Sequence, residues 1–180
     1  MITTYFLFMF CKADGRFTMI KRLLLVSDDM MFAERAGDFA INLASQLRCD
    51  VYGLFIYDSI EYLAGEELVD AFVLDREVII NQLKNEGKKA LEEIRALAST
   101  NGVNFDGALI RGEDPVAEIF EIAQKKKVDM IIVGLPGKTG AIDGALGLIP
   151  ARLLHAKGKS PCPITILPNS VTGLGQALDH

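Results

Sequence analysis

Short apolar segments alternate with longer amphipathic segments along this chain. The first apolar segment, Arg22 to Ser27, contains Leu-Leu-Leu-Val, a continuous run that is typical of a strand buried on both faces. After it, apolar side chains recur at steps of three and four residues from Phe32 to Leu47, which places them along one side of a helix. Repeated several times, this alternation predicts a parallel sheet with helices on both faces.

The alternation continues to residue 167. The other predicted strands are Val51–Tyr57, Phe105–Arg111, Val128–Val133 and Ile164–Leu167. The other predicted helices are a long one through Ile79 and Leu97, one that begins at Asp114-Pro115 and ends on Lys125–Lys127, and a short one over Leu148–Ala156. Half of the 180 residues are apolar, which is enough for one core. We therefore predict a single three-layer α/β domain with an open five-stranded parallel sheet.

The composition excludes several classes of function. A formal net charge of -5 argues against a broad surface for nucleic acid or anionic lipid. Three cysteines without a Cys-x-x-Cys pair, and only two histidines, support neither a disulfide framework nor a metal site. The apolar run from Ile2 to Cys11 is about half the length of a membrane-spanning helix. A cytoplasmic protein with no membrane partner is expected.

The amino-terminal segment raises a question about the start of the chain. Met19-Ile20-Lys21-Arg22 resembles an ordinary start immediately before the first strand. Our hypothesis is that translation begins at Met19, so that residues 1–18 are a leader, residues 19–168 are the domain, and residues 169–180 are a loose polar tail. Mass spectrometry of the native protein decides this.

Two loops follow predicted strands and mark a candidate crevice. Ligands of open α/β sheets collect beyond the carboxyl ends of the strands, where the winding reverses. One loop contains Ser27-Asp28-Asp29, and the other runs from Gly134 to Gly147. If the strands that precede these loops are neighbours, both loops face the same crevice.

Glycine spacing gives the second loop its chemistry. Two residues separate Gly134 from Gly137, and nine more lead to Gly147 at the start of a helix. Glycines allow the backbone to approach an anion closely, and free N–H groups of a loop and a helix start bind phosphate oxygens. Lys138 lies within this loop, where it is either a cation near the phosphates or an ordinary solvated surface lysine. The loop is predicted to hold the phosphates of a nucleotide.

These segments together resemble the universal stress protein (UspA-like) family, whose ATP-binding members carry the same glycine spacing followed by Ser or Thr. The resemblance rests on Leu-Leu-Leu-Val-Ser-Asp, Arg-Gly-Glu-Asp-Pro, Val-Asp-Met-Ile-Ile-Val-Gly and Pro-Cys-Pro-Ile. It implies the adenine nucleotide alpha hydrolase-like fold with strand order 3-2-1-4-5. It also implies a homodimer joined through the edge of the fifth strand, which is short and apolar here.

The resemblance further implies the roles of individual residues. Asp28 stands where the family meets the ribose and adenine, and Val51 stands where a strand backbone contacts adenine. The three loop glycines stand at the phosphates of ATP or AMP, with Mg²⁺ accompanying ATP. Leu148 replaces the family's Ser or Thr, and Pro150 replaces a second hydroxyl residue. One or two lost hydrogen bonds to a charged phosphate would weaken binding by about 10- to 10⁴-fold.

Three interpretations follow. The leading one is a nucleotide-responsive regulatory protein, with at most slow ATP hydrolysis because no catalytic motif is present. The second is a nucleotide-free dimeric adaptor, in which Asp28 only caps a helix and the glycines only make a turn. The third, a receiver-like signalling domain, has little support because the predicted strand ending in Ile110-Arg111 lacks a phosphoacceptor aspartate.

Overall fold

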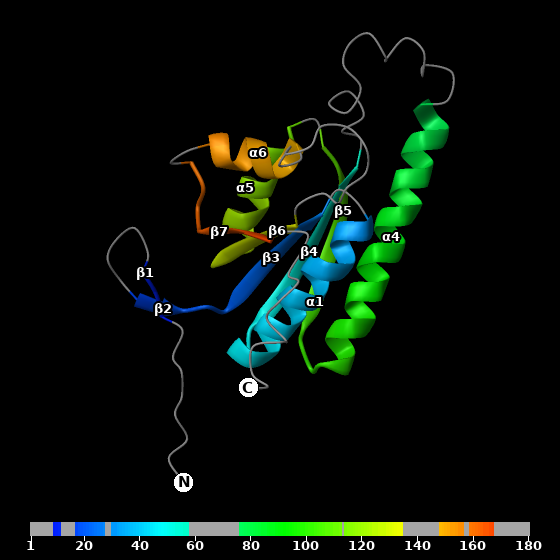
Figure 1. Cartoon of the computed structure of the whole chain (residues 1–180). Coiled ribbons are helices and arrows are strands. Elements are labelled where there is room, and N and C mark those ends of the chain that lie inside the picture. Colours follow the sequence, from blue (N-terminus) through cyan, green and yellow to red (C-terminus); the bar gives the residue numbers. More distant parts are fainter. Residues whose placement is uncertain are drawn as a thin grey trace, which may run out of the picture.

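A single parallel sheet forms the centre of the domain (Figure 1). The computed structural model describes residues 9–11, 17–27, 30–57, 76–112, 114–134, 148–156 and 159–167. The strands of the sheet are β3 (Arg22–Ser27), β4 (Asp50–Tyr57), β5 (Phe105–Arg111), β6 (Met130–Gly134) and β7 (Ile164–Leu167). They lie in the order β5-β4-β3-β6-β7, and every neighbouring pair is parallel. The predicted order 3-2-1-4-5 is confirmed.

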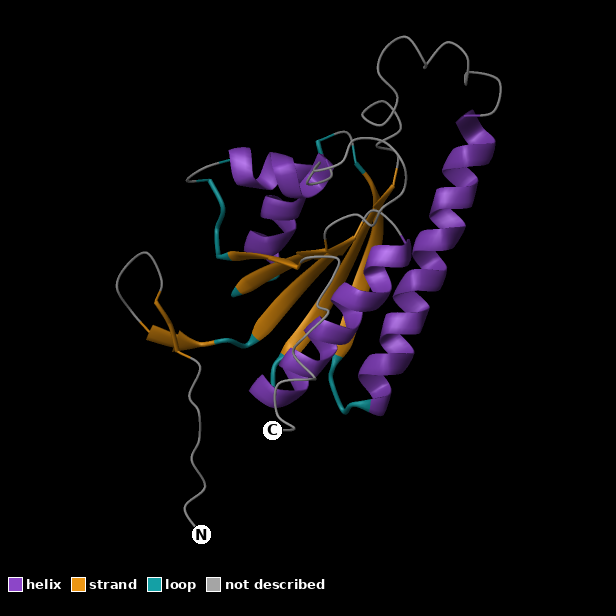
Figure 2. Ribbon diagram, viewed as in Figure 1, coloured by secondary structure: helices purple, strands orange, loops and turns teal. Residues whose placement is uncertain are grey.

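Helices cover both faces of this sheet, so the predicted three layers are also confirmed (Figure 2). The helices are α1 (Met30–Leu47), α4 (Arg76–Thr100), α5 (Pro115–Lys125) and α6 (Leu148–His155). Alternate residues of β3 point to opposite faces, as the pleat requires. Leu23 and Leu25 pack under α1 and α4, whereas Leu24 and Val26 pack under α5 and α6. The all-apolar sequence of β3 is therefore explained by burial on both faces.

Helix α4 approaches the sheet closely over a pair of glycines. Gly53 of β4 and Gly107 of β5 are partners in the register. A Cβ atom on Gly53 would lie 2.6 Å from the ring of Phe105 and 2.9 Å from Leu91. The aromatic ring and the leucine thus occupy the space that a side chain on Gly53 would fill, so that α4 packs closely on the sheet.

The ends of α5 explain one difference from the predicted elements. Asp114 caps the helix, with its side chain accepting a hydrogen bond from the backbone N–H of Ala117, and Pro115 occupies the first turn, as predicted. The strand predicted to begin at Val128 begins at Met130 instead. The backbone N–H of Val128 donates to the carbonyl of Ala123 at 2.8 Å, so Val128 still belongs to the turn that ends the helix.

A small antiparallel hairpin precedes the sheet and was not predicted. Strand β1 (Met9–Cys11) pairs with β2 (Phe17–Met19), with Met9 opposite Met19. Met19 is the last residue of β2. A chain that begins at Met19 would lack β1, the strand with which β2 pairs. The start at Met19 stays a prediction. No described helix has the length and apolar character needed to span a membrane.

Candidate functional site

The sheet reverses its winding between β3 and β6. From β3 the chain passes through α1 and α4 to β4 and β5, and both helices lie on one face. It then returns through α5 to β6 on the other side of β3, with α5 and α6 on the opposite face. The helices therefore diverge beyond the carboxyl ends of β3 and β6. This is the geometry in which open α/β sheets bind ligands.

Small residues end both strands at this crevice. Val26 of β3 is in register with Val133 of β6, so Ser27 and Gly134 follow as neighbours on strands about 4.8 Å apart. Ser27 is buried, with 7% of its surface exposed, and Gly134 is half-buried. Because the side chains at both positions are small, main-chain atoms of Ser27 and Gly134 can lie close to the crevice. The structure thus brings together the two strand ends that the sequence singled out.

Two apolar side chains anchor the helix that follows the glycine loop. Ile149 and Leu153 of α6 are 1% and 3% exposed in the core that α6 shares with α5. Leu148 is the first residue of α6, as predicted, although its side chain lies outside the described residues. Pro150 is buried at the third position of the helix and carries no N–H, so the first turn of α6 offers one donor fewer.

Val51 does not lie at the crevice. It pairs with Leu23 and Phe105 near the amino ends of their strands and is 2% exposed in the core under α1 and α4. The residue of β4 in register with Ser27 is Phe55, four positions later, which corresponds to about 13 Å along a strand. The backbone of β4 that reaches the carboxyl edge belongs to Ile56 and Tyr57.

Other site residues of the sequence analysis lie outside the described part of the chain. They are Asp28, Gly137, Lys138 and Gly147. Their neighbours Ser27, Gly134 and Leu148 are described and fix where each of these segments leaves or enters the fold.

The end of β5 brings a further glycine to the same edge of the sheet, and this glycine is not among the predicted site residues. Gly112 is buried, and its N–H donates to the carbonyl of Tyr57 at 3.1 Å. A Cβ atom there would lie 2.6 Å from Ile56 and 2.9 Å from the Glu118 carboxylate. The Arg-Gly-Glu-Asp-Pro segment was the available signal, because a glycine between a strand and a capped helix often marks a close backbone approach.

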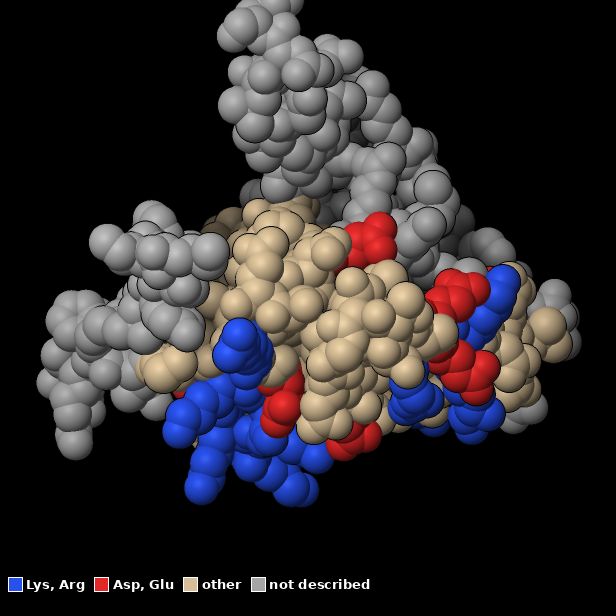
Figure 3. All heavy atoms as spheres, turned by 90° about the horizontal axis from the view of Figure 1, so that it is seen from below, with Lys and Arg blue, Asp and Glu red and all other residues tan. Residues whose placement is uncertain are grey.

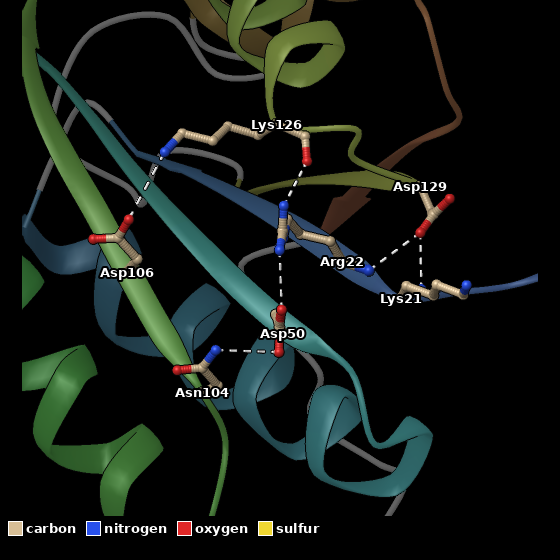
Figure 4. Close-up of polar contacts among 7 residues, drawn as sticks. All are labelled: Lys21, Arg22, Asp50, Asn104, Asp106, Lys126 and Asp129. Atoms are coloured by element: carbon tan, nitrogen blue, oxygen red, sulfur yellow. Dashed lines mark hydrogen bonds and ion pairs between the residues drawn. The ribbon is translucent and has the colours of Figure 1, made fainter.

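The opposite end of the sheet is held by charged side chains (Figure 4). The Arg22 guanidinium donates to Asp50 at 3.1 Å and to the carbonyl of Lys126 at 2.7 Å. One oxygen of Asp129 accepts from the backbone N–H groups of Lys21 and Arg22 at 2.8 and 3.2 Å. These contacts join the starts of β3, β4 and β6, so they fix the frame from which the crevice is built.

No catalytic or metal centre is visible in the described residues. None of their His, Cys, Asp and Glu side chains gather in a group of three or more that could hold a metal ion. Burial, with a smaller contribution from the nearby Asp50 and Asp129 carboxylates, raises the pKa of the Cys49 thiol to about 11. Cys49 therefore stays protonated at neutral pH, which is unsuitable for a nucleophile.

Comparison with known proteins agrees with this geometry. The model of the universal stress protein family matches residues 19–168. The chain belongs to this family. A relative in the family is Universal stress protein MJ0531 of Methanocaldococcus jannaschii, which is 29% identical over 147 residues, covering 82% of this chain and 81% of the relative. The solved UspA from Lactobacillus plantarum has a TM-score of 0.64 at 18% identity, covering 83% of this chain and 99% of that one.

Several solved structures of the family contain adenine nucleotides. One is a universal stress protein in complex with cAMP, with a TM-score of 0.55 and 19% identity over 85% of this chain and all of that one. Another, from Arabidopsis thaliana, has AMP bound, with a TM-score of 0.55 and 17% identity over 84% of this chain and 93% of that one. A third, from Archaeoglobus fulgidus, is in complex with dAMP. At such identities the likeness establishes the shared fold.

Proposed function

We propose that this protein binds an adenine nucleotide across the crevice between β3 and β6 and acts in the cytoplasm as a regulatory protein. Its output is the occupied state rather than a turnover reaction. The observation that carries the proposal is the reversal of winding between β3 and β6, with Ser27 and Gly134 side by side at its carboxyl edge. AMP, dAMP and cAMP complexes of family members support adenine nucleotides as the ligand class.

The phosphates would lie on the segment between Gly134 and the start of α6. Gly134 ends β6, and the spacing to Gly137 and Gly147 is that of a phosphate loop. Free N–H groups at the first turn of α6 add donors and the positive end of a helix dipole. The ribose and adenine would lie on the other side, against Asp28 after β3 and the backbone of Ile56 and Tyr57 at the end of β4.

We further propose that AMP binds more tightly than ATP. Leu148 and Pro150 carry no hydroxyl group, and Pro150 carries no N–H. A triphosphate has more charge to satisfy than a monophosphate, so it loses more when the first turn of α6 offers fewer donors. Lys138 supplies one cation with three N–H donors, which offsets only part of this loss.

Calorimetric titration with AMP and with ATP, each with and without Mg²⁺, tests the proposal. The Leu148→Ser variant is expected to bind ATP about tenfold more tightly or better, because one hydrogen bond to a charged phosphate is restored. Leu154→Ser is the matched control, since Leu154 lies on the same helix and is 47% exposed. Equal ATP affinity in both variants would contradict the placement of the phosphates.

Absence of any nucleotide binding would favour the second function, a nucleotide-free adaptor. Acid extraction of the freshly purified protein followed by chromatography shows whether a nucleotide is carried through purification. A protein without extracted nucleotide and without millimolar affinity for AMP or ATP would be assigned to the adaptor class.

In either case we propose a homodimer formed through the edge of β7. The four residues Ile164–Leu167 are half-buried and lack charge, whereas the other edge strand, β5, carries the exposed Asp106. An apolar edge with unpaired main-chain groups favours pairing with a second strand. Ile166→Lys should convert the dimer to a monomer in sedimentation experiments, and Asp106→Asn, with the same change in charge at the other edge, should not. A monomeric unmodified protein would exclude the dimer.

A further inference from the structure

Cationic side chains gather at the end of the sheet opposite the crevice. We call this surface the basic end and define it by Lys21, Arg22, Lys125, Lys126 and Lys127, which come from the start of β3 and the end of α5. Figure 3 views the molecule from below and shows a group of Lys and Arg side chains at the lower left of the view. The concentration is notable because the whole chain has a formal net charge of -5. The positive field is therefore local.

The acidic residues of this region are occupied by internal contacts. Asp129 accepts hydrogen bonds from two backbone N–H groups at the start of β3. Asp50 accepts from the Arg22 guanidinium at 3.1 Å and from Asn104 at 3.3 Å, and Asp106 lies 3.8 Å from the Lys126 ammonium (Figure 4). Each of the three carboxylates thus has a partner within the protein.

Two of the five cations are occupied in the same way. Arg22 bridges Asp50 and the carbonyl of Lys126. The Lys126 ammonium lies 4.3 Å from the centre of the Tyr52 ring, which is 9% exposed, in addition to its contact with Asp106. These contacts hold the end of α5 against the start of β3. They bring the remaining lysines together and fix the backbone that carries them.

The other three lysines extend into solvent. Lys21, Lys125 and Lys127 are exposed, and within the described residues their ammonium groups have no ion pair or hydrogen bond. A favourable position at the negative end of the helix dipole accounts for Lys125. The same position favours Lys126 and Lys127, which follow directly, but it does not account for Lys21, which precedes a strand. The surface therefore has three cations available to a partner.

We propose that the basic end docks an acidic polypeptide segment of a partner protein. The surface offers three exposed cations on a fixed backbone, and an acidic segment has the complementary charge. The proposal is independent of nucleotide binding, since the basic end lies at the amino ends of the strands and the crevice at the carboxyl ends.

A short acidic segment fits better than a nucleic acid or a membrane. Nucleic-acid sites commonly use arginine forks and exposed aromatic rings, whereas the one arginine here is occupied and the Tyr52 ring lies under Lys126. A long polyanion or a charged membrane would extend beyond the lysines and be repelled by the rest of the chain, whose net charge is negative. The carboxylates of a short acidic segment can each lie within about 8 Å of a lysine, the distance over which charge acts at physiological salt.

Binding of a fluorescent oligoglutamate peptide to the full chain tests the proposal. Fluorescence anisotropy at low salt should show binding that weakens steadily as salt is added. The variant with Lys21→Gln, Lys125→Gln and Lys127→Gln should bind about tenfold more weakly, because three modest charge contacts are removed. The control carries Lys84→Gln, Lys88→Gln and Lys89→Gln on α4, which change the net charge equally at another surface. It should bind much as the unmodified protein does.

Three outcomes would overturn the proposal. They are no binding of the peptide at low salt, equal binding by the two triple variants, or tighter binding of a single-stranded oligonucleotide or of phosphatidylserine vesicles than of the peptide. Thermal unfolding of both triple variants accompanies the titrations. A loss of binding by the patch variant counts in favour only when its melting temperature stays close to that of the control.

Discussion

The two ends of the parallel sheet differ in the kind of residue that builds them. At the amino ends of the strands, charged side chains such as those of Arg22 and Asp129 bind the main chain of other segments. At the carboxyl ends, Ser27, Gly112 and Gly134 keep side-chain volume small. One end thus holds the strands together, while the other leaves main-chain atoms near the place where a ligand would enter.

Because the two ends are built differently, stability and binding can be separated within one small domain. A substitution at the amino end should change the free energy of unfolding and leave AMP affinity as it was. A substitution at the carboxyl end, such as Leu148→Ser, should change nucleotide affinity with little effect on unfolding. Each of the following predictions can break this separation.

The largest effect is expected from Cys49 at alkaline pH. Cys49 precedes β4 and is 6% exposed, and its pKa is raised from 9.0 to about 11. Because the folded protein holds this proton more tightly than the unfolded chain does, stability is lost as the pH rises from about 9 through about 11. Relative to a Cys49→Ala variant, the unmodified protein should lose about 2–3 kcal/mol over this interval.

Urea unfolding at several pH values in this interval measures the difference. Both proteins contain the same tyrosines and lysines, so the contributions of these groups cancel in the comparison. Cys162→Ala, which removes the half-buried cysteine before β7, serves as the control. Parallel stability curves for Cys49→Ala and the unmodified protein would show that the thiol titrates normally in the fold.

The second effect concerns Asp129, whose carboxylate binds two backbone N–H groups. Asp129→Ala should lower the free energy of unfolding by about 1–3 kcal/mol, because the N–H groups of Lys21 and Arg22 lose a charged acceptor. Asp129→Asn, which keeps one oxygen, should lose less. Asp38→Ala on the exposed side of α1 is the control for the removal of one charge. If Asp129→Ala also weakened AMP binding, the two ends of the sheet would be coupled.

Most of the fold could be predicted because apolar runs and helix caps are local signals. β3, β5 and β7 have the predicted bounds, and α5 begins at Pro115 behind its Asp114 cap as expected. β6 begins two residues later than predicted because the turn that closes α5 uses the N–H of Val128, and an apolar run does not reveal which bond a residue makes. The β1–β2 hairpin was missed because its pairing is antiparallel and outside the alternation.

The site was less predictable than the fold because it depends on the register between strands. The sequence correctly identified β3 and β6 as the strands whose ends meet. It placed Val51 at the ligand, but pairing puts Phe55 opposite Ser27 and leaves Val51 near the other end of β4. The sequence of a buried apolar strand does not show which of its residues reaches the carboxyl edge of the sheet. Only the partners on both sides, Leu23 and Phe105, decide this.

The smallest effect is expected for the contact of Lys126 with Tyr52. A double-mutant cycle of Lys126→Met and Tyr52→Leu should give a coupling energy of about 0.5–1 kcal/mol. The Asp106 carboxylate is 72% exposed, so its ion pair with Lys126 should contribute little, and Asp106→Asn serves as the comparison. The Tyr52 ring excludes water from one side of the Lys126 ammonium. Added salt should therefore lower the Lys126–Tyr52 coupling energy less than it lowers the contribution of the Lys126–Asp106 ion pair. A coupling of zero would mean that the Tyr52 ring does not stabilise the charge of Lys126, which would then keep only its ion pair with Asp106. Among the described residues, the amino end would then hold its strands mainly through Arg22 and Asp129.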